Sequence, residues 1–443
     1  MSKRNLLLLL PLLLCPFTGA RSADDVLKLY FKSIGIQQGL SHQMVNAIVK
    51  DPQGFIWIGT AEGLNRYDGT EFHVYRHEPG NPGSLSTSWI NCLYITRDGR
   101  LFIGTEKGVN VYNSQKENFE RISAENDSRN LLGNLRIRCF CEDSKGCLWI
   151  GTLDGLIRFD RRSGRINFYK LNHYDRDKMH NEVRSLCEDS AGRLWIGTFD
   201  GLYCRETESG VFKSVPLKGN PGDGNCLISG LHIQPEDPHT LYIAATGGLR
   251  VFDTETGGER HYHTANSGIA SNDVRDVTRY DATHVLAATS SGLSVFDIPS
   301  GGFTNFANSI TDPVSLPTQI VRCLFQDDNG LVWLGTNYGV ACCNSHRRPI
   351  DVHYINDTDA EGHTTRETIP DIAVLPGEIW IGTNNGLMCY SPDMRLKRHF
   401  TTKNSLLPHN NIKRILTDRS GIMWIGTNNG VVYLDKNRTT LRR

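Results

Sequence analysis

The sequence predicts an all-β protein, a β-propeller built of four-stranded blades. Three observations carry this prediction. One motif recurs along the chain, its copies lie roughly 45 residues apart, and each copy contains short strand-like segments separated by turn residues. Antiparallel sheets of four strands that repeat at such a period are typical of propeller blades around a central channel.

The motif is clearest at 51–68, DPQGFIWIGTAEGLNRYD, and nine copies follow one another as far as 423–435. We expect its aromatic residue to be buried between neighbouring sheets, and the glycine two residues later to let another backbone come close. Six copies carry both residues, at Trp57 and Gly59, Trp149 and Gly151, Trp195 and Gly197, Trp333 and Gly335, Trp380 and Gly382, and Trp424 and Gly426.

The third copy illustrates how each repeat is divided. Strands are expected at 136–142, 147–152, 156–160 and 165–170, because these segments are rich in β-forming residues and are bounded by turn residues. Between the second and third strands, a glycine such as Gly155 suits a tight hairpin that needs a positive φ. The D-x-x-G pattern that precedes the motif predicts an Asx-type turn rather than a calcium loop.

The first residues predict export to the periplasm. Residues 1–22 read as a signal peptide, because Lys3 and Arg4 precede an apolar run that is too short to span a bilayer. No second hydrophobic span follows, so no membrane span is expected in this chain. Lys plus Arg and Asp plus Glu are 48 each, which argues against a nucleic-acid partner.

The cysteines predict neither a metal site nor a particular disulfide. Cys92, Cys139 and Cys323 lie ten residues before motif aromatics, where other copies have alanine or serine, so this position is interpreted as a small, crowded core site. Cys139, Cys141 and Cys147 lack a neighbouring histidine, and their spacing is explained by strand alternation rather than by zinc. No metal and no cofactor are therefore expected.

The chain needs a device that fastens its first and last blades together. Residues 27–34 resemble a fourth strand without the other three, so we expect this segment to complete a late blade. We predict a seven-bladed ring over 23–348, followed at 349–443 by two further repeats of an incomplete second propeller. One ring of eight or nine blades is the alternative. The last residues, 436–443, lack a convincing fourth strand and could leave a slot for the N-terminal one.

The pattern W-I-G-T-x-x-G-L-x-R-Y-D at 57–68 resembles the two-component regulator propeller repeat. The order of signal, outer strand and repeats is similar to the N-terminal periplasmic sensor region of Bacteroidetes hybrid two-component systems. That resemblance implies sensing of glycan breakdown products to control polysaccharide-utilisation genes. In the family a membrane helix and a histidine kinase follow, and this sequence is similar to a truncated form without the kinase part, so we expect no enzyme activity.

The function expected is an extracytoplasmic ligand-sensing module for an oligosaccharide. Propellers bind ligands at the channel mouth, and sugar sites combine an aromatic platform with polar groups. Candidate ligand-binding residues in the polar loops between repeats are Trp89, the one tryptophan outside the motif position, and the cluster His173, Tyr174, Arg176 and Asp177. No residue is predicted to be catalytic.

Two alternatives stay open. A propeller-fold glycan-active enzyme would need two carboxylates facing each other across a cleft, whereas most carboxylates here lie at repeated turn positions. A protein-interaction scaffold is the other alternative, and the family resemblance implies a homodimer formed through the propeller, which can coexist with sensing. Because repetition marks structural residues, function is expected where the copies differ.

Overall fold

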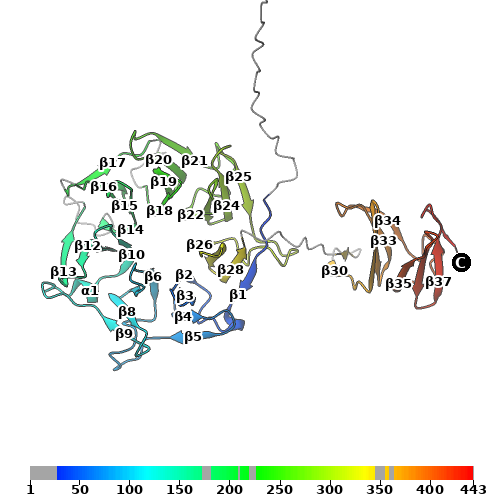
Figure 1. The fold of residues 1–443 in the computed structure, drawn as a ribbon, viewed down its shortest axis with the longest axis horizontal. Coiled ribbons are helices and arrows are strands. Elements are labelled where there is room, and N and C mark those ends of the chain that lie inside the picture. The colour runs from blue at the N-terminus through cyan, green and yellow to red at the C-terminus, as the bar shows by residue number, and fades with distance from the viewer. Residues whose placement is uncertain are drawn as a thin grey trace, which may run out of the picture. The chain divides into compact units, whose positions relative to one another are not determined.

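The structure, a computed structural model, describes residues 27–171, 181–207, 210–218, 226–344, 355–358 and 364–442. The chain divides into two compact units, one up to Pro349 and one from Ile350. Nine four-stranded antiparallel sheets occur in the described residues (Figure 1), which confirms the predicted all-β fold of propeller-type blades. The predicted signal peptide, 1–22, lies outside the described residues.

Six sheets of the first unit each consist of four consecutive strands, ordered from the innermost outward. Sheet 1 contains β2 (Val45–Lys50), β3 (Ile56–Thr60), β4 (Gly63–Tyr67) and β5 (Phe72–Tyr75). Sheet 2 contains β6 (Ile90–Ile95), β7 (Leu101–Thr105), β8 (Val109–Asn113) and β9 (Asn118–Arg121). Sheet 3 contains β10 (Ile137–Glu142), β11 (Leu148–Thr152), β12 (Gly155–Asp160) and β13 (Arg165–Tyr169), each within one residue of its predicted bounds.

The next three sheets repeat this order. Sheet 4 contains β14 (Val183–Glu188), β15 (Leu194–Thr198), β16 (Gly201–Arg205) and β17 (Phe212–Val215). Sheet 5 contains β18 (Ile228–Gln234), β19 (Asp237–Ala245), β20 (Gly248–Asp253) and β21 (Glu259–Tyr262). Sheet 6 contains β22 (Val274–Arg279), β23 (His284–Thr289), β24 (Gly292–Asp297) and β25 (Phe303–Phe306). Two short helices, η1 (Ile36–Gln38) and α1 (Leu131–Asn134), lie in connections.

Sheet 7 joins the two ends of the first unit. Its inner strands are β26 (Val321–Gln326), β27 (Leu331–Thr336) and β28 (Gly339–Asn344), and its outer strand is β1 (Lys32–Ile34). Lys32 pairs with Cys342 and Ile34 with Val340, so the prediction that the N-terminal strand completes a late blade is confirmed. The innermost strands contact one another in the order β2, β6, β10, β14, β18, β22, β26 and again β2, which closes the circle seen in Figure 1.

The motif tryptophan and glycine pack neighbouring sheets together, as predicted. Trp57 is only 1% exposed, and a Cβ placed on Gly59 would lie 2.6 Å from Ile90 Cγ2 of the next sheet. At the closing seam, a Cβ on Gly335 would lie 2.8 Å from Val45 Cγ1 of sheet 1. Glycine is needed at these positions because sheet 1 meets both of its neighbours at such distances.

The turns follow the predicted chemistry. Gly155 has a φ of 143°. Asp143 makes the expected Asx-type turn, because its Oδ1 accepts hydrogen bonds from the backbone N–H groups of Lys145 (3.0 Å) and Cys147 (2.8 Å). Its Oδ2 also accepts a bond from Trp149 Nε1 at 2.9 Å. The same aspartate therefore shapes the hairpin and satisfies the buried indole N–H, a pairing that the sequence analysis did not predict.

The cysteines lie where the crowded-site interpretation placed them. A Cβ on Gly151 would lie 2.4 Å from Cys139 Sγ, so the small residue on the inner strand and the glycine on the second strand fit together. All eleven cysteines within the described ranges are free. In the same ranges, no group of three or more His, Cys, Asp or Glu side chains could hold a metal ion. Neither of the two short helices that the described ranges contain has the length or hydropathy to cross a bilayer.

The second unit begins with the hairpin β29 (Asn356–Thr358) and β30 (Thr364–Arg366). Two sheets follow. Sheet 8 contains β31 (Asp371–Leu375), β32 (Glu378–Thr383), β33 (Gly386–Tyr390) and β34 (Leu396–Phe400), and sheet 9 contains β35 (Ile412–Thr417), β36 (Met423–Thr427), β37 (Gly430–Leu434) and β38 (Leu441–Arg442). The expectation that the last residues lack a fourth strand is wrong, because Leu441 pairs with Leu434.

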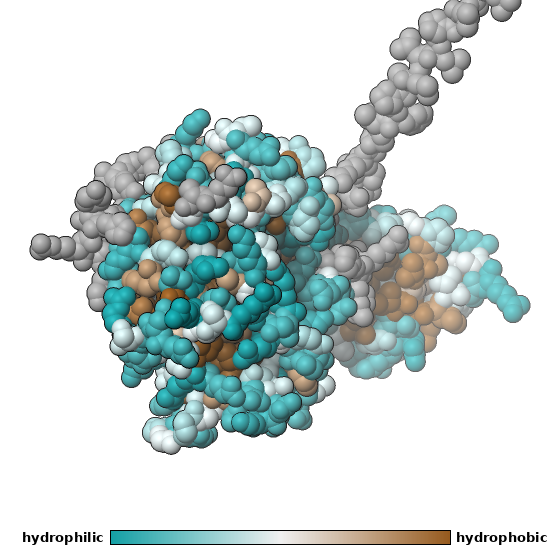
Figure 2. All heavy atoms as spheres, turned by 60° about the vertical axis from the view of Figure 1, so that its left-hand side comes forward, coloured by the Kyte–Doolittle hydropathy of each residue, from teal (hydrophilic) through white to brown (hydrophobic). Residues whose placement is uncertain are grey.

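The two sheets of the second unit pack on each other. The other face of sheet 9 is accessible, whereas on the other face of sheet 8 Ile381 and Met388 are buried with Ile355. Trp380 is fully buried between them, whereas Trp424 is 40% exposed. Figure 2 shows hydrophobic residues at the surface of this unit, and the exposed ones include Ile372, Val374 and Val431. The predicted burial of the motif tryptophan is therefore wrong at Trp424, because no described sheet covers that face.

Candidate ligand-binding site

The same β-bulge recurs near the start of each of the seven innermost strands of the first unit, and the bulged residues line the channel. Each of the seven strands begins with a fully buried aliphatic residue, and the pairing register shifts between that residue and the one two positions later. A β-bulge of this kind leaves one residue unpaired and redirects its side chain. The bulged residues are Asn46, Asn91, Arg138, Arg184, Ser229, Arg275 and Arg322, one from each sheet.

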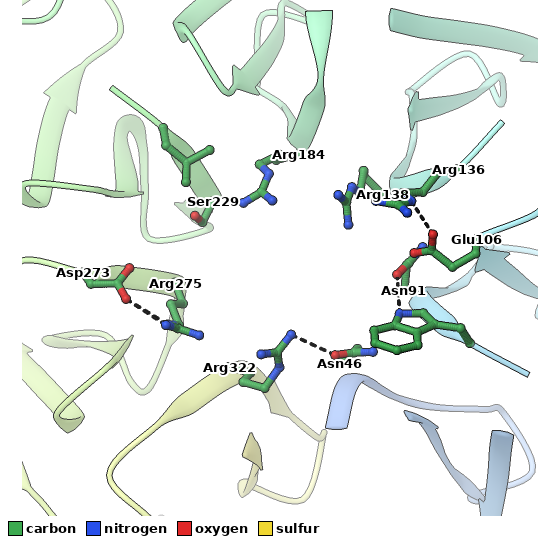
Figure 3. A pocket seen from close by; sticks show the side chains of 12 residues that line it. Asn46, Asn91, Glu106, Arg136, Arg138, Arg184, Ser229, Asp273, Arg275 and Arg322 are labelled. Carbon is green, nitrogen blue, oxygen red and sulfur yellow. Dashed lines mark hydrogen bonds and ion pairs between the residues drawn. The ribbon is translucent and has the colours of Figure 1, made fainter. Parts of the chain in front are cut away.

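These seven side chains surround one cavity. Figure 3 shows them converging from the ring of strands on a common open space. The cavity measures about 660 Å³ and is also lined by Trp89, Glu106, Arg136, Leu227 and Asp273. Four of these additional residues directly precede the first residue of an inner strand, and Glu106 lies in the β7–β8 turn. The site is therefore the mouth of the channel on the face where the connections between sheets arrive.

Three carboxylates hold most of the arginines of this cavity in place. Arg136 forms an ion pair with Glu106. Glu182 lies between two arginines, with its Oε1 2.7 Å from Arg138 Nε and 3.1 Å from Arg184 Nε.

The third carboxylate pairs within one sheet. Asp273 Oδ2 is 2.9 Å from Arg275 Nη2. These pairs fix the guanidinium groups from one side, so that their remaining N–H groups can face the channel.

Arg322 is held by amides instead of by an acid. It donates to Asn46 Oδ1 at 3.0 Å and to Asn337 Oδ1 at 3.3 Å. Among the described residues, no carboxylate forms an ion pair with it. Burial lowers the pKa of the Arg322 guanidinium below its usual value, and the neighbouring charge of Arg275 lowers it further. Both effects mean that this cation is held in an environment that disfavours its charge.

Trp89 supplies the aromatic surface of the site. It is 40% exposed, lines the cavity, and donates from Nε1 to Asn91 Oδ1 at 3.0 Å. This bond orients the indole while part of the ring stays accessible. The other sequence candidates, His173, Tyr174, Arg176 and Asp177, lie outside the described residues, so the structure does not place them beside Trp89.

The sequence analysis missed the arginines. They lie on inner strands rather than in the loops between repeats. The alternation of residues within one strand does not indicate which position is bulged. A signal was present, because the residue after the first buried aliphatic is Asn, Arg or Ser in different copies while its neighbours stay apolar or small.

A second hollow, of about 560 Å³, lies between sheets 2 and 3 at their β6–β7 and β10–β11 turns. Three of its charged groups, Asp98, Glu142 and Arg161, bind one another. Arg161 pairs with Asp98 at 2.7 Å and with Glu142, while Arg97 donates from Nη1 to the carbonyl oxygen of Asp143 at 2.9 Å. These bonds connect two neighbouring sheets, which is a structural role.

The closed circle of four-stranded sheets around a polar channel defines a β-propeller repeat protein. Its repeats are of a particular kind. Six segments match the family described as the two component regulator propeller, at residues 39–62, 84–107, 130–154, 177–200, 315–338 and 406–429. The chain therefore carries two-component regulator propeller repeats.

One curated relative and two solved structures are similar to this chain. Histidine kinase P4 of Formosa agariphila is 43% identical over 56 residues, which are 13% of this chain and 4% of the kinase. The extracellular domain of the putative hybrid two component system BT4673 from B. thetaiotaomicron aligns with a TM-score of 0.61 at 22% identity, over 94% of this chain and 54% of that one. The corresponding domain of BT3049 aligns with a TM-score of 0.59 at 20% identity, over 94% and 66%.

The two structural likenesses show a shared fold. The chain spans about half of the length of the BT4673 domain and a small part of the kinase. It has the propeller fold found in the extracellular domains of hybrid two-component systems.

Proposed function

We propose that this chain is the extracytoplasmic sensing module of a two-component signalling system, which binds an oligosaccharide and thereby controls polysaccharide-utilisation genes. The observation that carries the proposal is the ring of seven bulged polar residues around one cavity, with the exposed indole of Trp89 on its wall. Sugars are bound by such a combination, since an aromatic ring stacks on the apolar face of a pyranose while amides and guanidinium groups bond its hydroxyls.

Export supports the same proposal. Residues 1–22 have the pattern of a signal peptide, and the structural neighbours named above are extracellular domains. A module outside the cytoplasm can meet glycan fragments directly. The periplasm is the compartment in which we place it.

Binding rather than catalysis fits the carboxylates of the cavity. Glycoside hydrolysis uses two carboxyl groups, one as an acid and one as a base or nucleophile. The two carboxylates that line this cavity, Glu106 and Asp273, are each engaged by an arginine. We therefore propose that the ligand is recognised and released unchanged.

Melting of the full chain with a panel of neutral and acidic oligosaccharides tests this function. Because a ligand that binds only the folded state stabilises it, at least one saccharide should raise Tm. Trp89→Ala should abolish that rise, whereas Trp424→Ala, which truncates an equally exposed indole in the second unit, should leave it intact. A rise that Trp89→Ala does not change, no rise with any saccharide, or release of new reducing ends would each contradict the proposal.

A further inference from the structure

The channel mouth contains more positive than negative charge. Five arginines line it, Arg136, Arg138, Arg184, Arg275 and Arg322. Among the described residues four of them pair with three carboxylates, one of which serves two arginines at once, and Arg322 pairs with none. Because the whole chain has a formal net charge of zero, this excess is a local property of the site.

The excess has an energetic cost in the unliganded protein. Several guanidinium groups converge on one partly enclosed space (Figure 3), where they repel one another and are incompletely hydrated. Arg322 is the clearest case, because it contacts only amide oxygens and its Nε, which is buried, has no hydrogen-bond partner in the described part of the chain. An anion in the channel would remove much of that cost.

The charge is also unevenly distributed around the ring. Sheets 1 and 2 contribute neutral groups at the bulge, Asn46 and Asn91, together with the indole of Trp89. Sheets 3, 4, 6 and 7 contribute arginines at the same bulge position. A ligand that matches this wall has a neutral, hydroxyl-rich part that can stack on an aromatic ring and a second part that carries negative charge.

We propose that the oligosaccharide bound here is acidic, with a carboxylate or sulfate group that binds arginines of the channel, Arg184 and Arg322 among them. This inference rests on the function proposed above and specifies its ligand class. The planar guanidinium group donates two parallel hydrogen bonds to such oxyanions. The neutral part of the ligand lies against Trp89, Asn46 and Asn91.

Calorimetric titration of the full chain tests the inference with matched probes. The probes are uronic-acid disaccharides, their neutral methyl esters, sulfated galactose disaccharides with the unsulfated parents, free galacturonate and inorganic sulfate. An acidic disaccharide should bind, its neutral counterpart should bind about tenfold more weakly or not at all, and added salt should reduce the difference. Comparison of the uronate and sulfate series identifies which anion is used.

The variants separate the arginine contacts from general charge effects. Arg184→Gln and Arg322→Gln should each weaken binding of the acidic disaccharide by about tenfold or more. Arg121→Gln removes the same charge from an exposed position on the outer strand β9 and should leave binding unchanged. Should Arg322→Gln alter folding by releasing Asn46, Arg184→Gln with wild-type melting still decides the matter.

Three results would overturn the inference in distinguishable ways. Equal binding of neutral and acidic disaccharides, or unchanged affinity in both glutamine variants, would refute the acidic ligand while leaving an oligosaccharide sensor intact. Binding of free sulfate or galacturonate as tightly as any disaccharide would refute an oligosaccharide as the ligand, and the proposed function with it. Failure of every saccharide to bind would refute both.

Discussion

Trp333 and Trp424 occupy the same motif position, one in the closed ring of the first unit and one in the second unit. Trp333 is 6% exposed and Trp424 is 40% exposed. The glycines two residues later differ in the same way: a Cβ on Gly335 would lie 2.4 Å from Cys323 Sγ, while a Cβ on Gly426 would meet nothing closer than 3.9 Å. Motif residues that look identical in the sequence are therefore under different packing constraints.

The comparison extends to the first strand of each sheet. Ile48 on β2 is 5% exposed, whereas its counterpart Ile372 on β31 is 51% exposed. In the ring every sheet has a neighbouring sheet on both faces, whereas in the described part of the second unit each sheet packs on one other sheet. The motif therefore stabilises the fold in proportion to the neighbours that it meets, because its residues act between sheets.

The largest difference is expected from the tryptophans themselves. Trp57→Ala removes an indole that packs against Tyr112, with ring centroids 4.7 Å apart. Its Nε1 also donates a hydrogen bond to Asp51 Oδ2 at 2.7 Å. We expect a loss of roughly 3 to 5 kcal/mol in the free energy of unfolding. Trp424→Ala should cost less, roughly 1 to 3 kcal/mol, because 40% of its side chain is already accessible, although its Nε1 also donates to Asp418 Oδ2 at 3.0 Å.

Urea unfolding followed by far-UV circular dichroism measures both variants, each against the wild-type transition of its own unit. Equal costs for Trp57→Ala and Trp424→Ala would break the comparison. That outcome would mean that the exposed face of sheet 9 is covered in solution.

A smaller difference is expected from the glycines. Gly335→Ala pushes a methyl group against Cys323 and Val45 at the seam between sheets 7 and 1, and should cost about 1 to 3 kcal/mol. Gly426→Ala meets open space and should be neutral or stabilise by up to about 1 kcal/mol, since alanine restricts the unfolded chain. The same urea unfolding experiment measures both variants. A destabilising effect of Gly426→Ala would contradict the finding that this face of sheet 9 is accessible.

The smallest difference is expected from two aspartates at one repeat position. Asp276 and Asp371 both lie at the position filled by Cys139 in sheet 3, and each accepts a backbone N–H from the next sheet: Leu324 at 2.8 Å and Ile415 at 2.9 Å. Burial raises the pKa of the Asp276 carboxyl from 3.8 to about 6, against the lowering effect of the two backbone N–H groups that it accepts.

The sign of the pH effect follows from that pKa. The folded state binds the Asp276 proton more tightly than the unfolded chain, so this group's contribution to stability is fully present below about pH 4 and is lost as the pH rises through about 6. Asp276→Asn should remove this dependence and stabilise the protein at pH 7 by roughly 1 to 2 kcal/mol, with no gain at pH 4. Asp371→Asn, on the open unit, serves as the matched control, and an equal gain there would contradict the effect of the closed ring.

Much of the fold could be predicted because a repeated residue has a repeated physical reason. Gly155 adopts the positive φ that its hairpin demands, Asp143 forms the Asx turn, and β1 fills the place of a fourth strand. Each of these depends on chemistry within a few residues or on a pattern present many times. The fourth strand of sheet 9 was missed because β38 has only two residues and no periodicity to indicate it.

The site could be predicted only in part. Trp89 was selected because it breaks the pattern, and it does line the cavity. Arg184 and Arg322 were not predicted, because a bulge depends on how two strands pair. The alternating pattern of one strand does not show it. The Arg138–Glu182–Arg184 arrangement also depends on two neighbouring sheets, so only the assembled ring shows it.

The composite sheet 7 also determines when the ring can form. Lys32 pairs with Cys342. The two strands that close the circle are therefore synthesised at the beginning and at the end of the first unit. The N-terminal strand has no partner until β28 has emerged, and bringing such distant segments together carries a loop-closure entropy that grows with the intervening length. Contacts of this range slow folding. We therefore expect closure to be the last event of assembly, with β1 keeping an unpaired edge until then that chaperones or neighbouring chains can bind.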